Sequence, residues 1–182
     1  LSQGADHQQK ESINTGKIIC IGGCTEDRKM AVEIFDPTKG HWSIAERTLE
    51  TRQQFGMVPI SRTNLLLFGG VGVNPQVIPQ SVVFSTLTGT FTNHHLTLST
   101  PKYSFCYLFQ APKLYIIGGV AVSPGAQLPS ADVEEYDVVS GECRTVPSLK
   151  EARSEASCVQ LGSSIVVIGG RGVNGQSLKS VE

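Results

Sequence analysis

Four Gly-Gly pairs divide this chain of 182 residues at nearly even intervals. Each pair directly follows four apolar residues, as in LLLFGG and IVVIGG. The second glycines of successive pairs are 47, 49 and 51 residues apart. A fixed period of this length indicates that one supersecondary unit is stacked repeatedly. The pairs are Gly22 and Gly23, Gly69 and Gly70, Gly118 and Gly119, and Gly169 and Gly170.

Each period contains four short patterns typical of strands. In the second period, an apolar-rich run at 55–60 and a polar turn precede the apolar run at 65–68, and a third run follows at 81–85 after a variable loop. Short apolar, β-branched and aromatic runs bounded by Gly, Pro, Asn and Ser predict hairpins. Four strands in about 50 residues are typical of a propeller blade. Helical periodicity is weak, so we expect an all-β fold in which each apolar run before a glycine pair is buried on both faces.

Two further positions recur in register with the strands. Six residues after Asp36 stands Trp42, and the same step from Ser85 and Asp137 leads to Phe91 and Cys143. A basic residue then opens the next period. These basic residues are Arg52, Lys102 and Arg153. Because a position that recurs in every unit serves the shared architecture, we expect these residues to be structural.

These elements resemble the kelch repeat, and most closely the kelch domain of BTB-kelch (kelch-like) proteins. The segment VEIFDPTKGHWS followed by Arg52, and LKSVE at the end of the chain, match elements of that family. The resemblance covers residues 17–182. It implies a kelch-type β-propeller fragment of about three and a half four-stranded blades, with repeats at about 17–51, 52–101, 102–152 and 153–182. Residues 1–16 are expected to form a polar linker, and the chain to be part of a longer protein.

Composition argues against several kinds of partner. The formal net charge is −1, so the sequence carries no electrostatic signature for nucleic acid or an anionic membrane. No apolar run approaches the ~18 residues needed to span a bilayer. The five cysteines are odd in number and scattered, which argues against a disulfide framework and favours a reducing, cytoplasmic setting. Cys20, Cys106 and Cys158 are candidate redox sensors, but no basic residue flanks them in sequence to lower a thiol pKa.

Catalytic and metal-binding patterns are weak. Alternation along a strand predicts that His94 and His95 point to opposite faces and cannot share a ligand site. No serine or cysteine has the local signature of a nucleophile, and the glycine pairs lack the lysine of a phosphate loop. The tyrosines all fall at strand-like positions, where packing is the simpler interpretation. We therefore expect no enzyme activity, no cofactor and no metal.

Length variation is concentrated in one loop of each unit. From the second glycine to the Asp position takes 13, 15 and 18 residues, whereas the remainder of the period takes 34, 34 and 33. Loops that vary over a constant scaffold are where binding is usually built, and in stacked repeats they lie on one face. These loops are 24–30, 71–80, 120–130 and 171–177. Candidate partner-binding residues in them are Arg28, Asn74, Arg171 and Asn174.

The resemblance adds positions to this face. In kelch-like proteins, the residue two places after the repeat basic residue contributes to binding, which implies Gln54, Ser104 and Glu155 here. The residue directly after a glycine pair also contributes, which again indicates Arg171.

The function implied by the resemblance is protein binding. The chain would be the substrate-recognition part of a BTB-kelch adaptor for a cullin-RING ubiquitin ligase. Its loop face would receive a protein substrate or scaffold partner, and a cullin would bind only through regions outside this chain. The alternatives are an actin-associated or other scaffold kelch protein and, less favoured, a propeller enzyme such as an oxidase or a sugar mutarotase.

Overall fold

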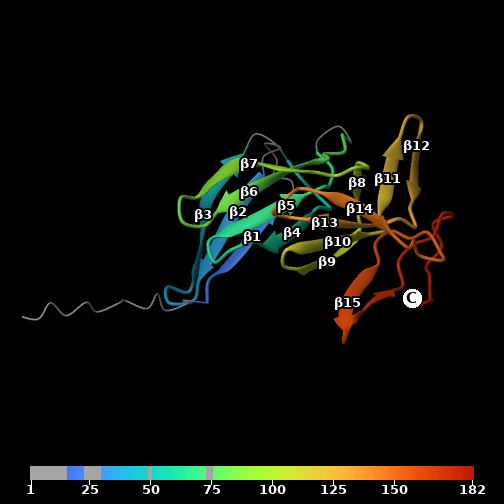
Figure 1. Ribbon diagram of the computed structural model, residues 1–182. Helices are drawn as coiled ribbons and strands as arrows, with labels where there is room; N and C mark the ends of the chain where they lie inside the picture. The colour runs from blue at the N-terminus through green and yellow to red at the C-terminus, as the bar shows by residue number, and fades with distance from the viewer. Residues whose placement is uncertain (1–15, 23–29, 49–50, 73–75) are drawn as a thin grey trace, which may run out of the picture.

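The computed structural model describes residues 16–22, 30–48, 51–72 and 76–182 as strands joined by turns and loops. Figure 1 shows several antiparallel sheets lying beside one another. None of the described elements is a helix, so these ranges hold no helix long and apolar enough to cross a membrane. The all-β prediction is therefore confirmed.

The first two sheets follow the order of the chain. The first has three strands, β1 (Ile18–Gly22), β2 (Met30–Asp36) and β3 (His41–Thr48). The second has four strands, β4 (Gly56–Pro59), β5 (Asn64–Phe68), β6 (Gln80–Ser85) and β7 (Thr90–Thr97). In both, the strand that ends at a glycine pair lies next to the strand that follows the variable loop.

The third and fourth sheets repeat this plan. The third consists of β9 (Cys106–Gln110), β10 (Lys113–Ile117), β13 (Val133–Asp137) and β14 (Cys143–Val146). The fourth pairs β15 (Ser157–Leu161) with β16 (Ser164–Ile168), and Val181 and Glu182 return along β16. A further sheet joins β8 (Lys102–Tyr103), β11 (Val120–Ser123) and β12 (Ala126–Pro129). Within the described residues, the four main sheets correspond to the predicted blades, two with four strands and two with fewer.

The same cross-strand pair recurs in three blades. Phe35 faces Trp42 in the first blade with ring centroids 5.4 Å apart, and Phe84 faces Phe91 in the second at 4.9 Å. In the third blade, Cys143 lies opposite Tyr136. The Trp position of the repeat is thus one structural position even where its side chain differs.

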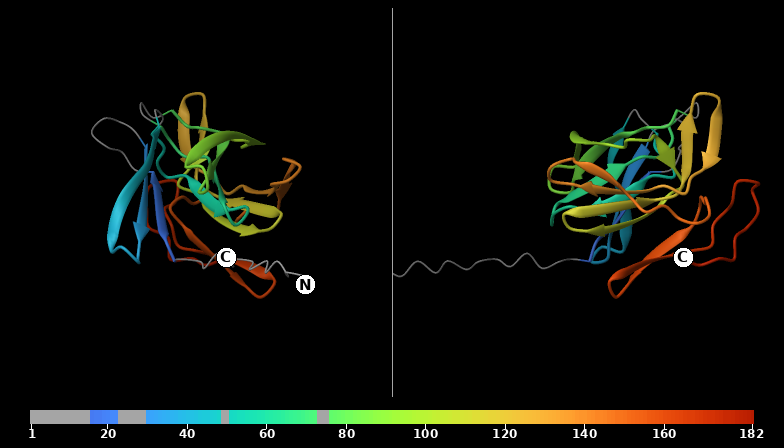
Figure 2. Two further views of the ribbon diagram at one scale, coloured as in Figure 1. Left: turned by 90° about the vertical axis from the view of Figure 1, so that its left-hand side faces the viewer. Right: turned by 45° about the vertical axis from the view of Figure 1, so that its right-hand side comes forward.

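Neighbouring blades lie side by side and are rotated relative to one another (Figure 2). Apolar side chains fill the space between them. The layer between the second and third blades includes Phe68, Leu114 and Tyr136, all fully buried. Burial of the run before the glycine pair on both faces holds in these two blades, where Leu66, Leu67 and Phe68 are each 0 % exposed. It is wrong for the outer blades, where Ile18 and Ile168 are 53 % and 46 % exposed, because each has a neighbouring blade on one side only.

Backbone hydrogen bonds link each glycine pair to the next blade. The Gly70 N–H donates to the carbonyl oxygen of Lys102 at 3.1 Å, and the Gly119 N–H donates to that of Arg153 at 2.9 Å. The side chains of these basic residues then bind within their own blade. Lys102 Nζ lies 2.7 Å from Glu134 Oε2, and both groups are buried.

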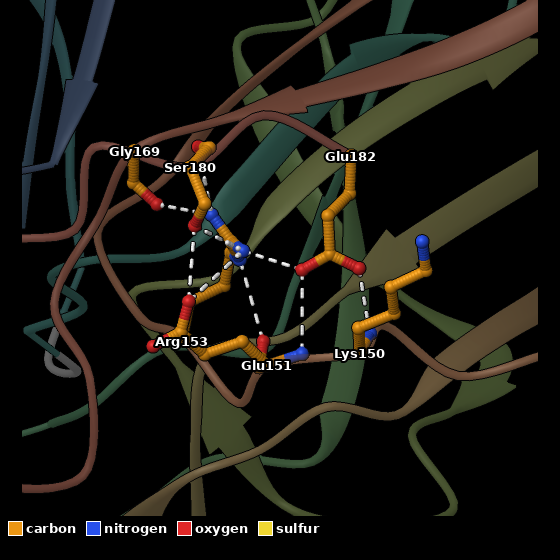
Figure 3. Close-up of polar contacts among 6 residues, drawn as sticks. All are labelled: Lys150, Glu151, Arg153, Gly169, Ser180 and Glu182. Atoms are coloured by element: carbon orange, nitrogen blue, oxygen red, sulfur yellow. Dashed lines mark hydrogen bonds and ion pairs between the residues drawn. The ribbon is translucent and has the colours of Figure 1, made fainter.

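The Arg153 side chain makes several hydrogen bonds within the fourth blade (Figure 3). Its guanidinium is 0 % exposed and donates to the carbonyl oxygen of Gly169 at 2.8 Å, to Ser180 Oγ at 3.0 Å and to Glu182 Oε1 at 2.5 Å. In the second blade, Arg52 is 3 % exposed and donates to the carbonyl oxygen of Gln80 at 3.0 Å. In these three blades, the repeat basic residue therefore joins the segment before the first strand to the strand that follows the variable loop.

Candidate functional site

Three residues that are not glycine adopt the left-handed backbone conformation in the described part of the chain. They are Gln54 (φ +53°), Ser104 (φ +52°) and Glu155 (φ +54°). Each lies two residues after a repeat basic residue and just before β4, β9 or β15. These edge strands, which contact one another between neighbouring blades, are called the inner strands below. This conformation costs an L-residue about 1–2 kcal/mol, because Cβ comes too close to the carbonyl oxygen. The three positions predicted from the resemblance are thus the same three strained positions.

Backbone hydrogen bonds link these three residues into a hydrogen-bonded chain across three blades. The Ser104 N–H donates to the carbonyl oxygen of Gln54 at 3.1 Å, and the Glu155 N–H donates to that of Ser104 at 2.8 Å. The side chains of Gln54 and Glu155 are exposed, and that of Ser104 is half-buried. The arrangement brings an amide, a hydroxyl and a carboxylate to adjacent points at one end of the inner strands.

The glycine pairs make room for this chain. A Cβ on Gly70 would lie 2.6 Å from the carbonyl oxygen of Gln53, and one on Gly119 would lie 2.8 Å from that of Tyr103. Gln53 and Tyr103 directly precede the left-handed residues. Since both glycines also have positive φ, of +92° and +91°, only a residue without a Cβ fits without displacement. Gly70 and Gly119 therefore allow the backbone just before the left-handed residues to pack closely against the glycine pairs.

Arg171 and Glu155 are brought together in the fourth blade. Arg171 pairs with Ser154 through two backbone hydrogen bonds of 2.7 and 2.9 Å. Its Nε lies 2.9 Å from Glu155 Oε2, with the two side chains 58 % and 54 % exposed. Because both side chains are exposed, they are accessible to a partner. An exposed ion pair of this kind adds only about 0–1 kcal/mol to stability, so a partner can replace it at little cost. Asn174 is exposed in the turn that follows Arg171.

The predicted variable loops have more structure than expected. Residues 120–130 form the β11–β12 hairpin, which pairs with β8 and projects beyond the sheets in Figure 1. The Tyr103 hydroxyl donates to Gln127 Oε1 of this hairpin at 3.1 Å on an exposed surface. Sequence reasoning missed both residues. The Pro124-Gly125 turn between two alternating runs was a usable hairpin signal.

A cavity of about 620 Å³ lies beside the loop of the second blade. Its lining includes Arg52, Val77, Ile78, Val82 and Asn93. Val77 and Ile78 look exposed in the sequence, but the structure shows them half-buried against this cavity. The position held by Glu134 in the third blade is occupied here by Val82. The second blade therefore offers a more apolar recess than the third at the same repeat position.

Three of the predicted residues lie outside the described part of the chain. They are Arg28, Asn74 and the repeat residue Gly23. The loop 24–30 is described only at Met30, and the linker 1–16 only at Gly16.

Comparison with known proteins identifies the repeat. The Kelch motif family matches residues 101–150, which span the third blade. The fold is a kelch-type β-propeller. A kelch-containing F-box/kelch-repeat protein of Arabidopsis thaliana is 36 % identical over 70 residues, or 38 % of this chain. Kelch-like protein 34 of Homo sapiens is 34 % identical over 93 residues, or 47 % of this chain. The aligned stretches span 19 % and 14 % of the lengths of these two relatives.

A solved structure supports the same fold. The structure of YjhT superposes with a TM-score of 0.67 at 15 % sequence identity. The match covers 83 % of this chain and 48 % of that one. At this identity the likeness concerns the fold alone, and it covers more of the chain than the family match does.

The histidine prediction is wrong in one respect. His94 and His95 do not point apart, because their ring centroids are 4.1 Å apart and the rings stack. A register shift between Gln80 and Ser81 on β6, opposite these residues, breaks the alternation of the strand. The Leu96 N–H donates to His94 Nδ1 at 3.2 Å. Burial, and then the neighbouring His95 ring, lower the pKa of His94.

Tyr107, Tyr115 and Tyr136 pack in the apolar layers between blades, as the sequence indicates, whereas the Tyr103 hydroxyl lies on an exposed surface. The Tyr107 hydroxyl donates to the carbonyl oxygen of Met57 at 3.1 Å, and Tyr136 accepts the Ser99 N–H at 2.8 Å. Within residues 16–22, 30–48, 51–72 and 76–182, no three His, Cys, Asp or Glu side chains gather in a group able to hold a metal ion.

Proposed function

We propose that this chain is a protein-binding segment of a kelch propeller and that its loop face receives the partner. The described residues of this loop face are Gln54, Ser104, Glu155, Arg171 and Asn174. The sequence also assigns Arg28 and Asn74 to the variable loops. The observation that carries the proposal is the hydrogen-bonded chain of three left-handed residues across three blades.

The strain at these positions favours a binding role over a structural one. Glycine would adopt the same backbone conformation without the Cβ conflict. The chain instead holds three different polar side chains there, and backbone strain of this kind gathers at ligand-binding sites. Because the three side chains differ in chemistry, they supply specificity that an identical repeat could not. We propose no catalytic role for this face.

We further propose that the partner is a protein substrate and that the whole protein is a BTB-kelch adaptor for a cullin-RING ubiquitin ligase acting in the cytoplasm. The motifs VEIFDPTKGHWS and LKSVE support this reading. Likeness to a protein named Kelch-like protein 34 is consistent with it. The cullin contact would lie outside this chain.

Affinity capture of the full-length protein from cells tests the adaptor role. Recovery of a cullin is the expected result. Repeated captures that contain actin filaments and no cullin would reject the adaptor and favour a scaffold protein.

Paired substitutions test the loop face separately. Glu155→Ala with Arg171→Ala should weaken binding of a captured partner about tenfold or more, as expected for central interface residues. Glu142→Ala with Arg62→Ala removes the same charges from exposed turns at the opposite ends of their strands and should leave binding unchanged. Equal binding by both double variants would show that the partner uses another surface.

A further inference from the structure

Two cysteines meet at the junction between the third and fourth blades. Cys106 lies on the inner strand β9 and Cys158 on the inner strand β15, and these strands are direct neighbours. Both side chains belong to the apolar layer between the blades. Cys106 is 6 % exposed, and Cys158 is half-buried.

The two thiols lie on adjoining segments of the chain. Cys158 Sγ donates to the carbonyl oxygen of Tyr107 at 3.2 Å, and Tyr107 is bonded to Cys106. The Cys158 side chain packs against the buried group that includes Cys106. The Cys106 thiol has a second, longer contact of 3.8 Å to the carbonyl oxygen of Ile117. Cys158 is therefore held beside the β9 segment that carries Cys106.

The surroundings give the two thiols different roles. The neighbouring Cys106 thiol lowers the pKa of Cys158, whereas the Cys158 thiol, together with burial, raises the pKa of Cys106. A low-pKa, accessible thiol beside a second thiol is the usual arrangement of a redox-sensitive pair. The sequence prediction rests only on flanking basic residues, whereas the group that lowers the pKa of Cys158 is a thiol on another blade.

We propose that Cys106 and Cys158 are an oxidation site that forms a reversible disulfide between the third and fourth blades. The oxidant is a peroxide. In the first step the Cys158 thiolate attacks a peroxide oxygen, the O–O bond breaks, and hydroxide leaves, so that Cys158 becomes a sulfenic acid. In the second step the Cys106 sulfur attacks the Cys158 sulfur and the S–O bond breaks. The departing hydroxide takes the Cys106 proton, so two thiols and one hydrogen peroxide yield one disulfide and two waters.

The place of this disulfide gives it a consequence for the loop face. Ser104 lies two residues before Cys106, and Glu155 lies three residues before Cys158. The hydrogen bond from the Glu155 N–H to the carbonyl oxygen of Ser104 joins the same two chain segments at 2.8 Å. Oxidation would therefore fix the junction that holds these two left-handed residues together. The disulfide itself does not depend on the proposed function.

Peptide mapping of the full chain tests the site. The chain is treated with hydrogen peroxide at low protein concentration, alkylated, digested without reductant and analysed by mass spectrometry. The expected product is a linked pair of peptides containing Cys106 and Cys158, lost again on treatment with dithiothreitol. Recovery of both cysteines in alkylated form, while the other cysteines are oxidised, would overturn the proposal.

Variants then test the order of events. In Cys106→Ser, Cys158 should accumulate as a sulfenic acid that reacts with a dimedone probe, because no thiol remains to resolve it. In Cys158→Ser, dimedone should not label Cys106, because Cys106 is not the residue that reacts with peroxide. The exposed Cys143 provides a control, since Cys143→Ser should leave the linked pair unchanged. Sulfenic acid at Cys106 rather than Cys158 would contradict the assigned roles, and the wild-type mapping remains decisive if a variant does not fold.

Discussion

The left-handed conformation of Ser104 leads to a sharp prediction about stability. Ser104 sits in the middle of the backbone chain, with φ at +52°, and its N–H and carbonyl both bond to neighbouring blades. Glycine and alanine at this position keep both backbone bonds and remove the hydroxyl. They differ in the Cβ, which strains a left-handed residue by about 1–2 kcal/mol. Against this, glycine loses about 0.5–1 kcal/mol more than alanine in chain entropy on folding.

We therefore expect Ser104→Gly to be more stable than Ser104→Ala by about 0.5–1 kcal/mol. With a urea slope of about 2 kcal/mol/M, the unfolding midpoint should differ by about 0.3–0.5 M. The assay is urea unfolding followed by circular dichroism. Ser157, an exposed residue of β15 without a positive φ, supplies the matched control, because Ser157→Gly should be less stable than Ser157→Ala. Alanine that is as stable as glycine at position 104 would refute the strain argument.

Three further changes test the scaffold. Replacing the buried Arg153 with Met should lower the free energy of unfolding by about 3 kcal/mol, and a loss below about 1 kcal/mol would show that its buried contacts are dispensable. Gly119→Ala should destabilise more than Gly162→Ala by about 1–3 kcal/mol in urea unfolding, because both have positive φ but only Gly119 lacks space for a Cβ; equal losses would contradict the clash. Hydrogen bonding from Arg144 lowers the pKa of Glu135 from 4.5 to about 2, so this carboxylate stabilises the fold above pH 4.5 and loses that contribution as the pH falls toward 2. Glu135→Gln should flatten the fall in melting temperature over that range, and an unchanged slope would assign it to other groups.

Strand order and repeat length could be predicted from the sequence because they rest on local patterns. The run before Gly70 and its counterparts are strands, and the positions after the loops pair with them as expected. Burial at the ends of the stack could not be read in the same way, since exposure of Ile18 and Ile168 depends on how many blades surround them.

Features that depend on the relation between neighbouring strands escaped prediction. The stacking of His94 on His95 follows from a register shift on another strand, which leaves no mark at the histidines themselves. Cys106 corresponds to Ser157 in the repeat, so its contact with Cys158 arises from the stagger between inner strands and not from equivalent positions. Only the family resemblance indicated Ser104 and its two counterparts, because no glycine marks their backbone conformation.

The hydrogen bonds from Gly70 to Lys102 and from Gly119 to Arg153 have a consequence for how such a chain can change. Each joint between blades is made from peptide groups, so it is indifferent to whether lysine or arginine follows. If a whole unit were added or removed, the blades that became neighbours would still have a glycine N–H donor and a carbonyl acceptor in the same positions. The surface residues beside each joint are then free to diverge, one blade at a time, while the stack stays in register.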